Sequence, residues 1–435
     1  MTKNRKIQLI NGSSSSSSKT LNDFFNRPAF PEQAEEIARE VLAAVRGRGD
    51  RAIIEYTAKF DQVKLTPTSF RVRSSEISEA KGVVDAAFKR AAREAHRRVT
   101  AFSKRSLHKD WKVPTRHGGM LGEKFVPLDR VGAYIPGGVA PLVSTAIMTV
   151  TLARVAGVKE ILACTPCGAD GKVNPFVLYA LDLAGATEIY RLGGIQAIGA
   201  MAFGTKSVPK VQKIVGPGNQ FVTAAKRQVY GYVDLDLVAG PSEIAILSDQ
   251  TANPRYVAMD LLSQLEHGTG EERALLITTS KRVAREVIAF IDKETNLLSR
   301  GEWLREVLFK NLLVAVVKNM EEAIQLSNQF APEHLELMVK KPARWLKSIT
   351  AAGAIFVGPY SPEAAGDFAA GPSHVLPTGG NASVFSGLTV NDFRRRTSLI
   401  GLRRNDLKEV LPVIEAFGRV ESLDAHSRSA HVRFE

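Results

Sequence analysis

The chain has 435 residues, of which 44% are hydrophobic and 24% are charged, a composition typical of a soluble globular protein. This length exceeds one ordinary core and predicts roughly two to four domains. No run of about 18 apolar residues occurs and the N-terminus lacks the layout of a secretory signal, so we expect neither a membrane partner nor export. The formal net charge of +13 is compatible with nucleic acid, an anionic cofactor or an acidic surface as partner.

The N-terminal third is expected to be a tether followed by helices. The serine run at residues 13–18 is of low complexity and predicts a flexible tether. Residues 31–46 have helical periodicity, and a second helix opens at residue 74 and leads into the most basic segment, residues 89–109. Apolar residues recur at helical spacing through that segment, so we interpret its charges as the wet face of an amphipathic helix rather than a nucleic-acid surface.

From residue 131 short apolar runs end in loops of small residues, and helical stretches follow. The runs and their loops are 131–134 with 135–138, 160–164 with 165–166, 188–192 with 193–194, and 213–215 with 216–219. Serial strand-loop-helix units predict a doubly wound parallel sheet, in which ligands bind at the carboxyl ends of the strands. None of these loops is a true Gly-x-Gly-x-x-Gly. Loops of small residues that open helices can still hold a pyrophosphate through backbone N–H groups, and the alternative is that they are plain turns.

A second series of strand-like runs predicts another α/β domain. These runs lie at residues 243–247, 274–278, 313–317 and 354–357, with helical stretches between them. The tail from about Asn391 is charged and helical, which indicates a small separate unit. The only cysteines, Cys164 and Cys167, are too few for a structural zinc site, and such scarcity indicates a reducing compartment, hence the cytoplasm.

Gln264 and His267 form the first chemical candidate. Their i, i+3 spacing places both side chains on one face at the end of a helix that must stop near Gly268. A neutral imidazole is the commonest protein metal ligand, and an amide oxygen can join it. The alternative is the polar last turn of a capped surface helix.

Two later segments carry further candidates. Glu333 and His334 follow a proline that cannot continue the preceding helix, so we place them at a loop-to-strand junction. An adjacent acid and imidazole suit proton transfer, although the start of a surface strand would look the same. Asp367 and His374 lie in a stretch rich in glycine, proline and alanine, and long loops of this kind are usually functional.

Taken together, these segments resemble the histidinol dehydrogenase family from about residue 30 to residue 426. The motifs that carry the resemblance are YIPGG at 134–138, KIVGPGN at 213–219, AGPSE at 239–243, LSQLEH at 262–267, APEHL at 331–335 and HVLPTG at 374–379. Several long motifs in one order are far more specific than any one of them.

The resemblance implies a zinc enzyme that oxidises L-histidinol to L-histidine through L-histidinal with two NAD, the last step of histidine biosynthesis. It implies His334 as the general base and Glu333 as the group that activates water. The implied zinc ligands are Gln264, His267, Asp367 and His426. The implied substrate contacts are these four ligands with Ser242, His334, His374 and Glu421. The implied NAD contacts are Tyr134, Gln196 and Asn219.

The resemblance also implies an architecture of two similar, incomplete Rossmann-like parallel-sheet domains in an intertwined homodimer. The C-terminal unit would reach across, so that Glu421 and His426 complete the neighbouring subunit's pocket. The expected divisions are a tether and helical region that packs with the second α/β domain (1–128), an NAD-side domain (129–240), a domain with most zinc ligands (241–385) and a small dimerisation unit (386–435).

Two other functions fit parts of the sequence. One is a related metal- and NAD-dependent dehydrogenase of another amino or sulfonated alcohol. The other is a basic nucleic-acid-binding protein on an inactive α/β scaffold, which the intact candidate residues oppose.

Overall fold

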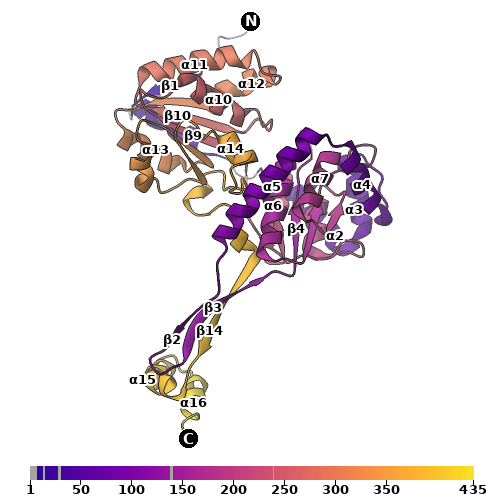
Figure 1. The fold of residues 1–435 in the computed structure, drawn as a ribbon, viewed down its shortest axis with the longest axis vertical. Helices are drawn as coiled ribbons and strands as arrows, with labels where there is room; N and C mark the ends of the chain where they lie inside the picture. The colour runs from indigo at the N-terminus through magenta and orange to yellow at the C-terminus, as the bar shows by residue number, and fades with distance from the viewer. Residues whose placement is uncertain (1–6, 13–14, 28–30, 138–140, 239) are drawn as a thin grey trace.

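The computed structural model describes residues 7–12, 15–27, 31–137, 141–238 and 240–435. They form two α/β lobes and a thin ribbon that carries a small helical unit away from both lobes (Figure 1). Within these ranges, no helix combines the length and apolar character that crossing a membrane requires.

The first lobe is built on a five-stranded parallel sheet with the order β6-β5-β4-β7-β8. Its strands are β4 (Arg130–Tyr134), β5 (Glu160–Cys164), β6 (Glu188–Tyr190), β7 (Lys213–Val215) and β8 (Asp234–Leu235). The chain adds strands outward from β4 to β6 and then returns to the other side of β4 with β7. A topological switch point therefore lies between β4 and β7. The predicted doubly wound sheet is confirmed, with the two-residue β8 as an additional strand.

Helices from both the lobe and the N-terminal region cover this sheet. One face carries α2 (Glu32–Arg48), α3 (Asp50–Tyr56), α8 (Gly194–Phe203) and α9 (Gln220–Val229). The other carries α4 (Ser74–Val83), α5 (Ala86–Ser106), α6 (Val143–Ala156) and α7 (Pro175–Ala184). The connection from α3 to α4 holds η1 (Thr57–Asp61) and η2 (Pro67–Ser69). The expectation that the N-terminal region packs with the second α/β domain is therefore wrong for α2 to α5, because their apolar faces complete the core of the first lobe.

The basic segment forms α5, as predicted. Asp85 caps the helix by accepting a hydrogen bond from the Phe88 amide at 2.8 Å. Ala92 and Val99 are buried against the first lobe, whereas most of the basic side chains are exposed. The charges are the solvated face of a packed helix.

The second lobe is built on a six-stranded parallel sheet with the order β1-β11-β10-β9-β12-β13. Its strands are β1 (Gln8–Asn11), β9 (Glu243–Ser248), β10 (Arg273–Thr278), β11 (Leu312–Val316), β12 (His334–Met338) and β13 (Ala354–Val357). From β9 onward the order repeats that of the first lobe, so the predicted similarity of the two domains is confirmed. Here the switch point lies between β9 and β12.

The second sheet is also covered on both faces. One face carries α10 (Pro254–Leu265), α11 (Lys281–Thr295) and α12 (Gly301–Asn311). The other carries α1 (Ser15–Phe25), α13 (Met320–Phe330) and η3 (Pro342–Ser348). The segment after β13 holds α14 (Glu363–Phe368), η4 (Asn381–Ser383) and η5 (Val390–Phe393).

The serine run is not a tether over the part that the structure describes. Ser13 and Ser14 lie outside the described residues, but α1 begins at Ser15. Leu21 and Phe24 of that helix are buried in the second lobe, and β1 pairs in parallel with β11. Apolar residues downstream of the serines therefore hold this segment in the fold.

The ribbon is an antiparallel sheet of order β14-β3-β2 that ends in two helices (Figure 1). Its elements are β2 (Trp111–Pro114), β3 (Met120–Pro127), β14 (Arg394–Gly401), α15 (Arg404–Val420) and α16 (Asp424–His431). The expected helical tail from Asn391 is wrong over β14, because that segment pairs along its whole length with β3. The helical character begins at Arg404.

Burial of the N-terminal helices predicts a stability effect at Val99. Replacing Val99→Ala removes two methyl groups from a fully buried site and should lower the free energy of unfolding by about 2 kcal/mol. The matched control Arg90→Ala, on the exposed face of α5, should change it by less than about 0.5 kcal/mol. Urea unfolding measures both, and equal effects of the two variants would contradict the packing of α5.

Candidate active site

The candidate catalytic residues lie at the amino ends of β9 and β12. Glu333 directly precedes β12 and His334 is its first residue, which confirms the predicted loop-to-strand junction. His334 pairs in register with Ile244, and Ser242 directly precedes β9. The second lobe thus gathers its candidates at the opposite end of the strands from the end that the sheet type predicts.

The main chain of Glu243 holds both Glu333 and His334. Its N–H donates to Glu333 Oε2 at 3.0 Å, and its carbonyl accepts from His334 Nδ1 at 3.0 Å. A carbonyl can only accept, so Nδ1 carries the proton of the neutral ring and Nε2 carries a lone pair. That Nε2 is buried and has no hydrogen-bond partner among the described residues.

Two carboxylates face this nitrogen. His334 Nε2 lies 3.9 Å from Glu363 Oε1 and 3.8 Å from Asp367 Oδ1. One ligand atom from each of the three residues lies within 4.8 Å of the others, a spacing that could hold a metal ion. The trio shares Asp367 with the predicted ligand set, but it brings in Glu363, which the sequence analysis missed.

A local signal for Glu363 was available. It stands four residues before Asp367, and the two side chains lie one turn apart on α14. The Glu363 amide donates to Glu336 Oε1 at 2.8 Å, which fixes the start of this short helix against β12. The spacing is visible in the sequence, whereas the approach to His334 depends on the packing of α14 against the sheet.

Burial governs the charges at the site. It lowers the pKa of His334 to about 3, which keeps the imidazole neutral. It raises the pKa of Glu333 well above the usual value, and the nearby Asp367 and Glu243 raise that pKa further. Burial together with the neighbouring Asp367 raises the pKa of Glu363 to about 8. Crowded, desolvated carboxylates favour a bound cation, because a positive charge would relieve their mutual repulsion.

Gln264 and His267 lie beside one another at the end of α10. The helix ends at Leu265, so His267 lies beyond its last turn, and Gly268 follows with a left-handed φ of 97°. Gln264 Nε2 lies 3.1 Å from His267 Nδ1. The Gln264 Oε1 atom is buried and has no hydrogen-bond partner among the described residues, so the amide oxygen is free for a ligand. Burial is the main cause of the lowered pKa of His334, and a charge on His267 lowers that pKa further. The two histidines are therefore close enough to interact electrostatically.

His374 connects the site to the first lobe. Its Nδ1 donates to the Asp367 carbonyl at 3.0 Å, and its Nε2 lies 3.2 Å from Thr145 Oγ1 on α6. Burial lowers the pKa of this histidine to about 4. The imidazole therefore contacts both lobes as a neutral ring.

Glu421 and His426 are far from these residues in the single chain. Glu421 caps the end of α15 and His426 lies on α16, and both are exposed. Their unit sits at the distal end of the ribbon, away from both lobes (Figure 1). A place for them in the site of a second copy stays a prediction.

The candidate NAD contacts gather at the carboxyl end of the first sheet. Tyr134 ends β4, and its hydroxyl accepts from the Gly194 amide at 3.1 Å. Gln196 is fully buried in α8, and its Nε2 donates to Asp61 Oδ2 at 2.9 Å. Asn219 is exposed and caps α9 by accepting from two backbone amides. Tyr134 and Asn219 thus follow the two strands that flank the switch point.

At the carboxyl end of the first sheet, the backbone of Gly216 lies very close to the backbone of Tyr134. Gly216 has a φ of 111°, and a Cβ there would lie 2.1 Å from the Tyr134 carbonyl oxygen. Only glycine fits such a position. The loop after β7 can therefore lie directly against the end of β4.

Both cysteines are free thiols in an environment that disfavours ionisation. Burial raises the pKa of the Cys164 thiol to about 12, and it also raises the pKa of Cys167. Burial thus disfavours the thiolate that redox chemistry requires.

Comparison with known proteins identifies the family. A family model described as histidinol dehydrogenase matches residues 26–434. The chain belongs to the histidinol dehydrogenase family. Histidinol dehydrogenase of Heliobacterium mobile is 45% identical over 396 residues, covering 91% of this chain and 92% of that one. The Bacillus cereus protein is 44% identical over 413 residues, covering 94% and 95%.

A solved structure agrees with this membership. The crystal structure of histidinol dehydrogenase from Elizabethkingia anophelis matches with a TM-score of 0.93 at 36% identity, covering 98% of each chain. Both lobes and the ribbon unit of this histidinol dehydrogenase family member therefore follow a known arrangement. The resemblance inferred from the motifs is confirmed, and the reading as an inactive nucleic-acid-binding scaffold is set aside.

Asp61 beside Gln196 generates a pH-dependent prediction. Burial raises its pKa to about 6, so the folded chain binds this proton more tightly than the unfolded chain, whose pKa is about 3.9. Asp61 therefore costs stability increasingly as the pH rises from about 4 to about 6. Asp61→Asn should raise the melting temperature at pH 7.5 and leave it nearly unchanged at pH 4. The exposed control Asp292→Asn should show no such difference, and a pH-independent gain for Asp61→Asn would contradict the burial argument.

Proposed function

We propose that this protein oxidises L-histidinol to L-histidine through L-histidinal, with two NAD as oxidants and zinc as the metal. The observation that carries the proposal is the position of His334. Its unprotonated Nε2 is buried, unpartnered among the described residues, and 3.8 Å from Asp367 Oδ1. Family membership supplies the substrate and this geometry supplies a proton acceptor beside a metal-binding group.

The residues present fit a divalent ion. Asp367 offers a carboxylate oxygen within 4.8 Å of ligand atoms of His334 and Glu363, a spacing that could hold a cation. Gln264 has a buried Oε1 with no hydrogen-bond partner among the described residues, and its Nε2 lies 3.1 Å from the His267 ring. Gln264, His267 and Asp367 thus offer an amide oxygen, an imidazole and a carboxylate. We propose these as zinc ligands, with His426 of the partner subunit as the fourth. When bound, zinc would supply a fixed charge that orients the substrate's amine and imidazole. Glu363 would stay close enough to balance that charge.

NAD would bind at the carboxyl end of the first sheet, held by Tyr134, Gln196 and Asn219. This proposal rests on the positions of Tyr134 and Asn219 beside the switch point and on the buried Oε1 of Gln196, which has no hydrogen-bond partner among the described residues. When bound, NAD supplies the hydride acceptor for each oxidation. The contact between His374 and Thr145 would hold the carboxyl end of the first sheet, with its NAD, close to the candidate catalytic residues of the second lobe.

Proton transfer falls to the Glu333–His334 pair. His334 Nε2 takes the hydroxyl proton of the alcohol, since the Glu243 carbonyl keeps the ring proton on Nδ1. Glu333 takes a proton from the water that attacks the aldehyde, because its carboxylate is held beside His334 by the Glu243 amide. Loss of a second proton and hydride from the hydrated aldehyde leaves the carboxylate. Ser242 and His374 line the substrate from this chain, and Glu421 of the partner subunit would complete the pocket.

A homodimer would bring the missing groups into place. Val413, Phe417 and Val420 lie on one face of α15 and are 56%, 62% and 78% exposed. Apolar faces of this kind usually mark an interaction surface. A second copy that covers α15 would carry Glu421 and His426 to the partner's site.

Reaction stoichiometry tests the proposed chemistry. Purified protein given L-histidinol should form two NADH for each L-histidine, and a chelator should abolish both oxidations until zinc is restored. Absorbance at the NADH band and amino-acid analysis measure the two products. Glu333→Gln should lower the yield towards one NADH for each histidinol consumed, because water activation is lost. Full turnover of the wild-type protein in chelator would exclude the metal role.

Shared sites predict complementation between inactive variants. Asp367→Ala and His426→Ala homodimers should each lose at least about 100-fold in kcat, because each lacks one proposed ligand. Unfolding and refolding them together should restore up to about a quarter of wild-type activity, because half the dimers are mixed and each of these has one intact site.

Refolding either variant alone provides the control for this mixing. Mixed dimers should also bind one zinc per dimer in excess of either homodimer. Absence of any regained activity or zinc on mixing would show that His426 does not serve the partner's site.

A further inference from the structure

Glu243 occupies a special place in the site because its backbone contacts both catalytic candidates. Its N–H holds Glu333 Oε2 and its carbonyl holds His334 Nδ1, each at 3.0 Å. A shift of this one residue would misplace the carboxylate and the imidazole together. The position of the Glu243 backbone therefore sets the geometry of proton transfer.

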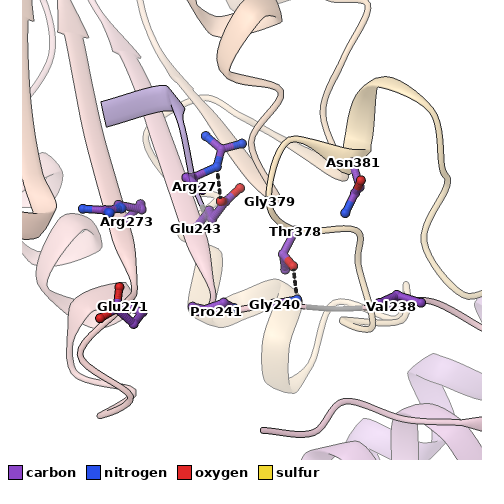
Figure 2. Close-up of a pocket in the computed structure, with 10 residues that line it drawn as sticks. All are labelled: Arg27, Val238, Gly240, Pro241, Glu243, Glu271, Arg273, Thr378, Gly379 and Asn381. Carbon is purple, nitrogen blue, oxygen red and sulfur yellow. Dashed lines mark hydrogen bonds and ion pairs between the residues drawn. The ribbon is translucent and has the colours of Figure 1, made fainter. Parts of the chain in front are cut away.

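The Glu243 side chain is tied to the N-terminal segment. Arg27 Nε lies 2.7 Å from Glu243 Oε1, and the two side chains are only 9% and 3% exposed. Figure 2 shows this ion pair. Burial raises the pKa of Glu243 to about 7, while the charge of Arg27 opposes that rise.

Arg27 also holds the segment that leads into β12. Its Nη2 donates to the Phe330 carbonyl at 2.8 Å, and its guanidinium carbon lies 4.1 Å from the Phe330 ring centroid. Phe330 ends α13 three residues before Glu333. One guanidinium therefore bridges the start of β9 and the approach to β12, the two segments that supply the catalytic pair.

The cavity beside this pair is too small to be a ligand site. It encloses about 30 Å³, room for about one water molecule, between Arg27, Glu243 and Thr378 (Figure 2). Simple packing would be served better by apolar side chains, because a buried ion pair loses hydration on both partners. A role in orienting Glu333 and His334 would explain why this position holds a charged pair rather than apolar side chains.

We propose that Arg27 and Glu243 are positioning residues that fix Glu333 and His334 in their reactive orientation. The proposal rests on the proposed function for its consequence, loss of turnover, but not for the contacts themselves. Neither side chain touches substrate in this scheme. The N-terminal segment, which the sequence predicts to be a tether, becomes part of the catalytic scaffold.

Charge-removal variants separate positioning from stability. Arg27→Met and Glu243→Gln alone should each lower the melting temperature, because each leaves a buried charge unpaired. The double variant should recover most of that loss, yet kcat should stay at least tenfold below wild type, with KM for histidinol and NAD within twofold. Arg27→Lys should fold well and show an intermediate kcat, because an ammonium can pair with Glu243 but lacks the planar fork that also reaches Phe330.

A control is the ion pair between Arg255 and Glu294 in the same lobe, with Nε 3.0 Å from Oε1, in which the glutamate is buried but the arginine is 62% exposed. The double variant Arg255→Met/Glu294→Gln should keep wild-type kcat. Recovery of wild-type kcat by Arg27→Met/Glu243→Gln, or by Arg27→Lys without any deficit, would overturn the positioning role.

Nitrogen NMR of histidine-labelled protein gives a readout that is independent of turnover. The wild-type His334 ring should show a protonated Nδ1 in slow exchange, assigned by its loss in His334→Gln. In Arg27→Met/Glu243→Gln that proton should exchange at least tenfold faster, and an unchanged rate would overturn the proposal. If the wild-type protein failed to oxidise histidinol, the proposed function would fail. The exchange rate of the His334 ring proton would still test whether Arg27 and Glu243 hold His334 in place.

Discussion

The burial of several ionisable groups at one end of the second sheet is the constraint on which the site depends. Glu333, His334 and Glu363 are all buried there, and Asp367 is nearly so. Desolvated carboxylates resist ionisation and a desolvated imidazole resists protonation, so each group needs a fixed partner. The backbone of Glu243 supplies two such partners, and the remaining lone pairs converge on a space that suits a cation. Structure and chemistry are coupled there, because the interactions that satisfy the buried groups also orient them.

The two lobes repeat one strand order but use it in opposite ways. In the first lobe the candidate NAD contacts lie at the carboxyl ends of β4, β6 and β7, as doubly wound sheets favour. In the second lobe the candidate catalytic pair stands at the amino end of β12, where a backbone carbonyl and amide of β9 are free to bind side chains. The contact between His374 and Thr145 joins these unlike edges. A reaction that needs both a cofactor and a proton acceptor can thus be divided between two copies of one architecture.

The sequence revealed the strands and the local chemistry better than the long-range packing. Runs at 160–164 and 213–215 coincide with β5 and β7, because buried parallel strands are continuous apolar stretches. The run at 354–357 coincides with β13, an edge strand that is apolar although partly exposed. The Arg-rich β14 escaped prediction because a strand in an exposed ribbon has no apolar face to reveal it. Helical periodicity showed that α2 and α5 bury one face, but it carries no information on which lobe receives that face. Glu363 was missed for a similar reason, since its role depends on a neighbour in another element.

The proposed homodimer would give the extended C-terminal unit a role in the site. Its helices lie beyond a three-stranded ribbon, and the apolar face of α15 is open to solvent in the isolated chain. The ribbon carries α15 and α16 away from both lobes (Figure 1). In the proposed homodimer, the extension that covers the exposed valines and Phe417 would also deliver an imidazole to a pocket that offers an amide, an imidazole and carboxylates. Dimerisation and metal binding would then stabilise each other, since a ligand that bridges two chains binds only their assembled form.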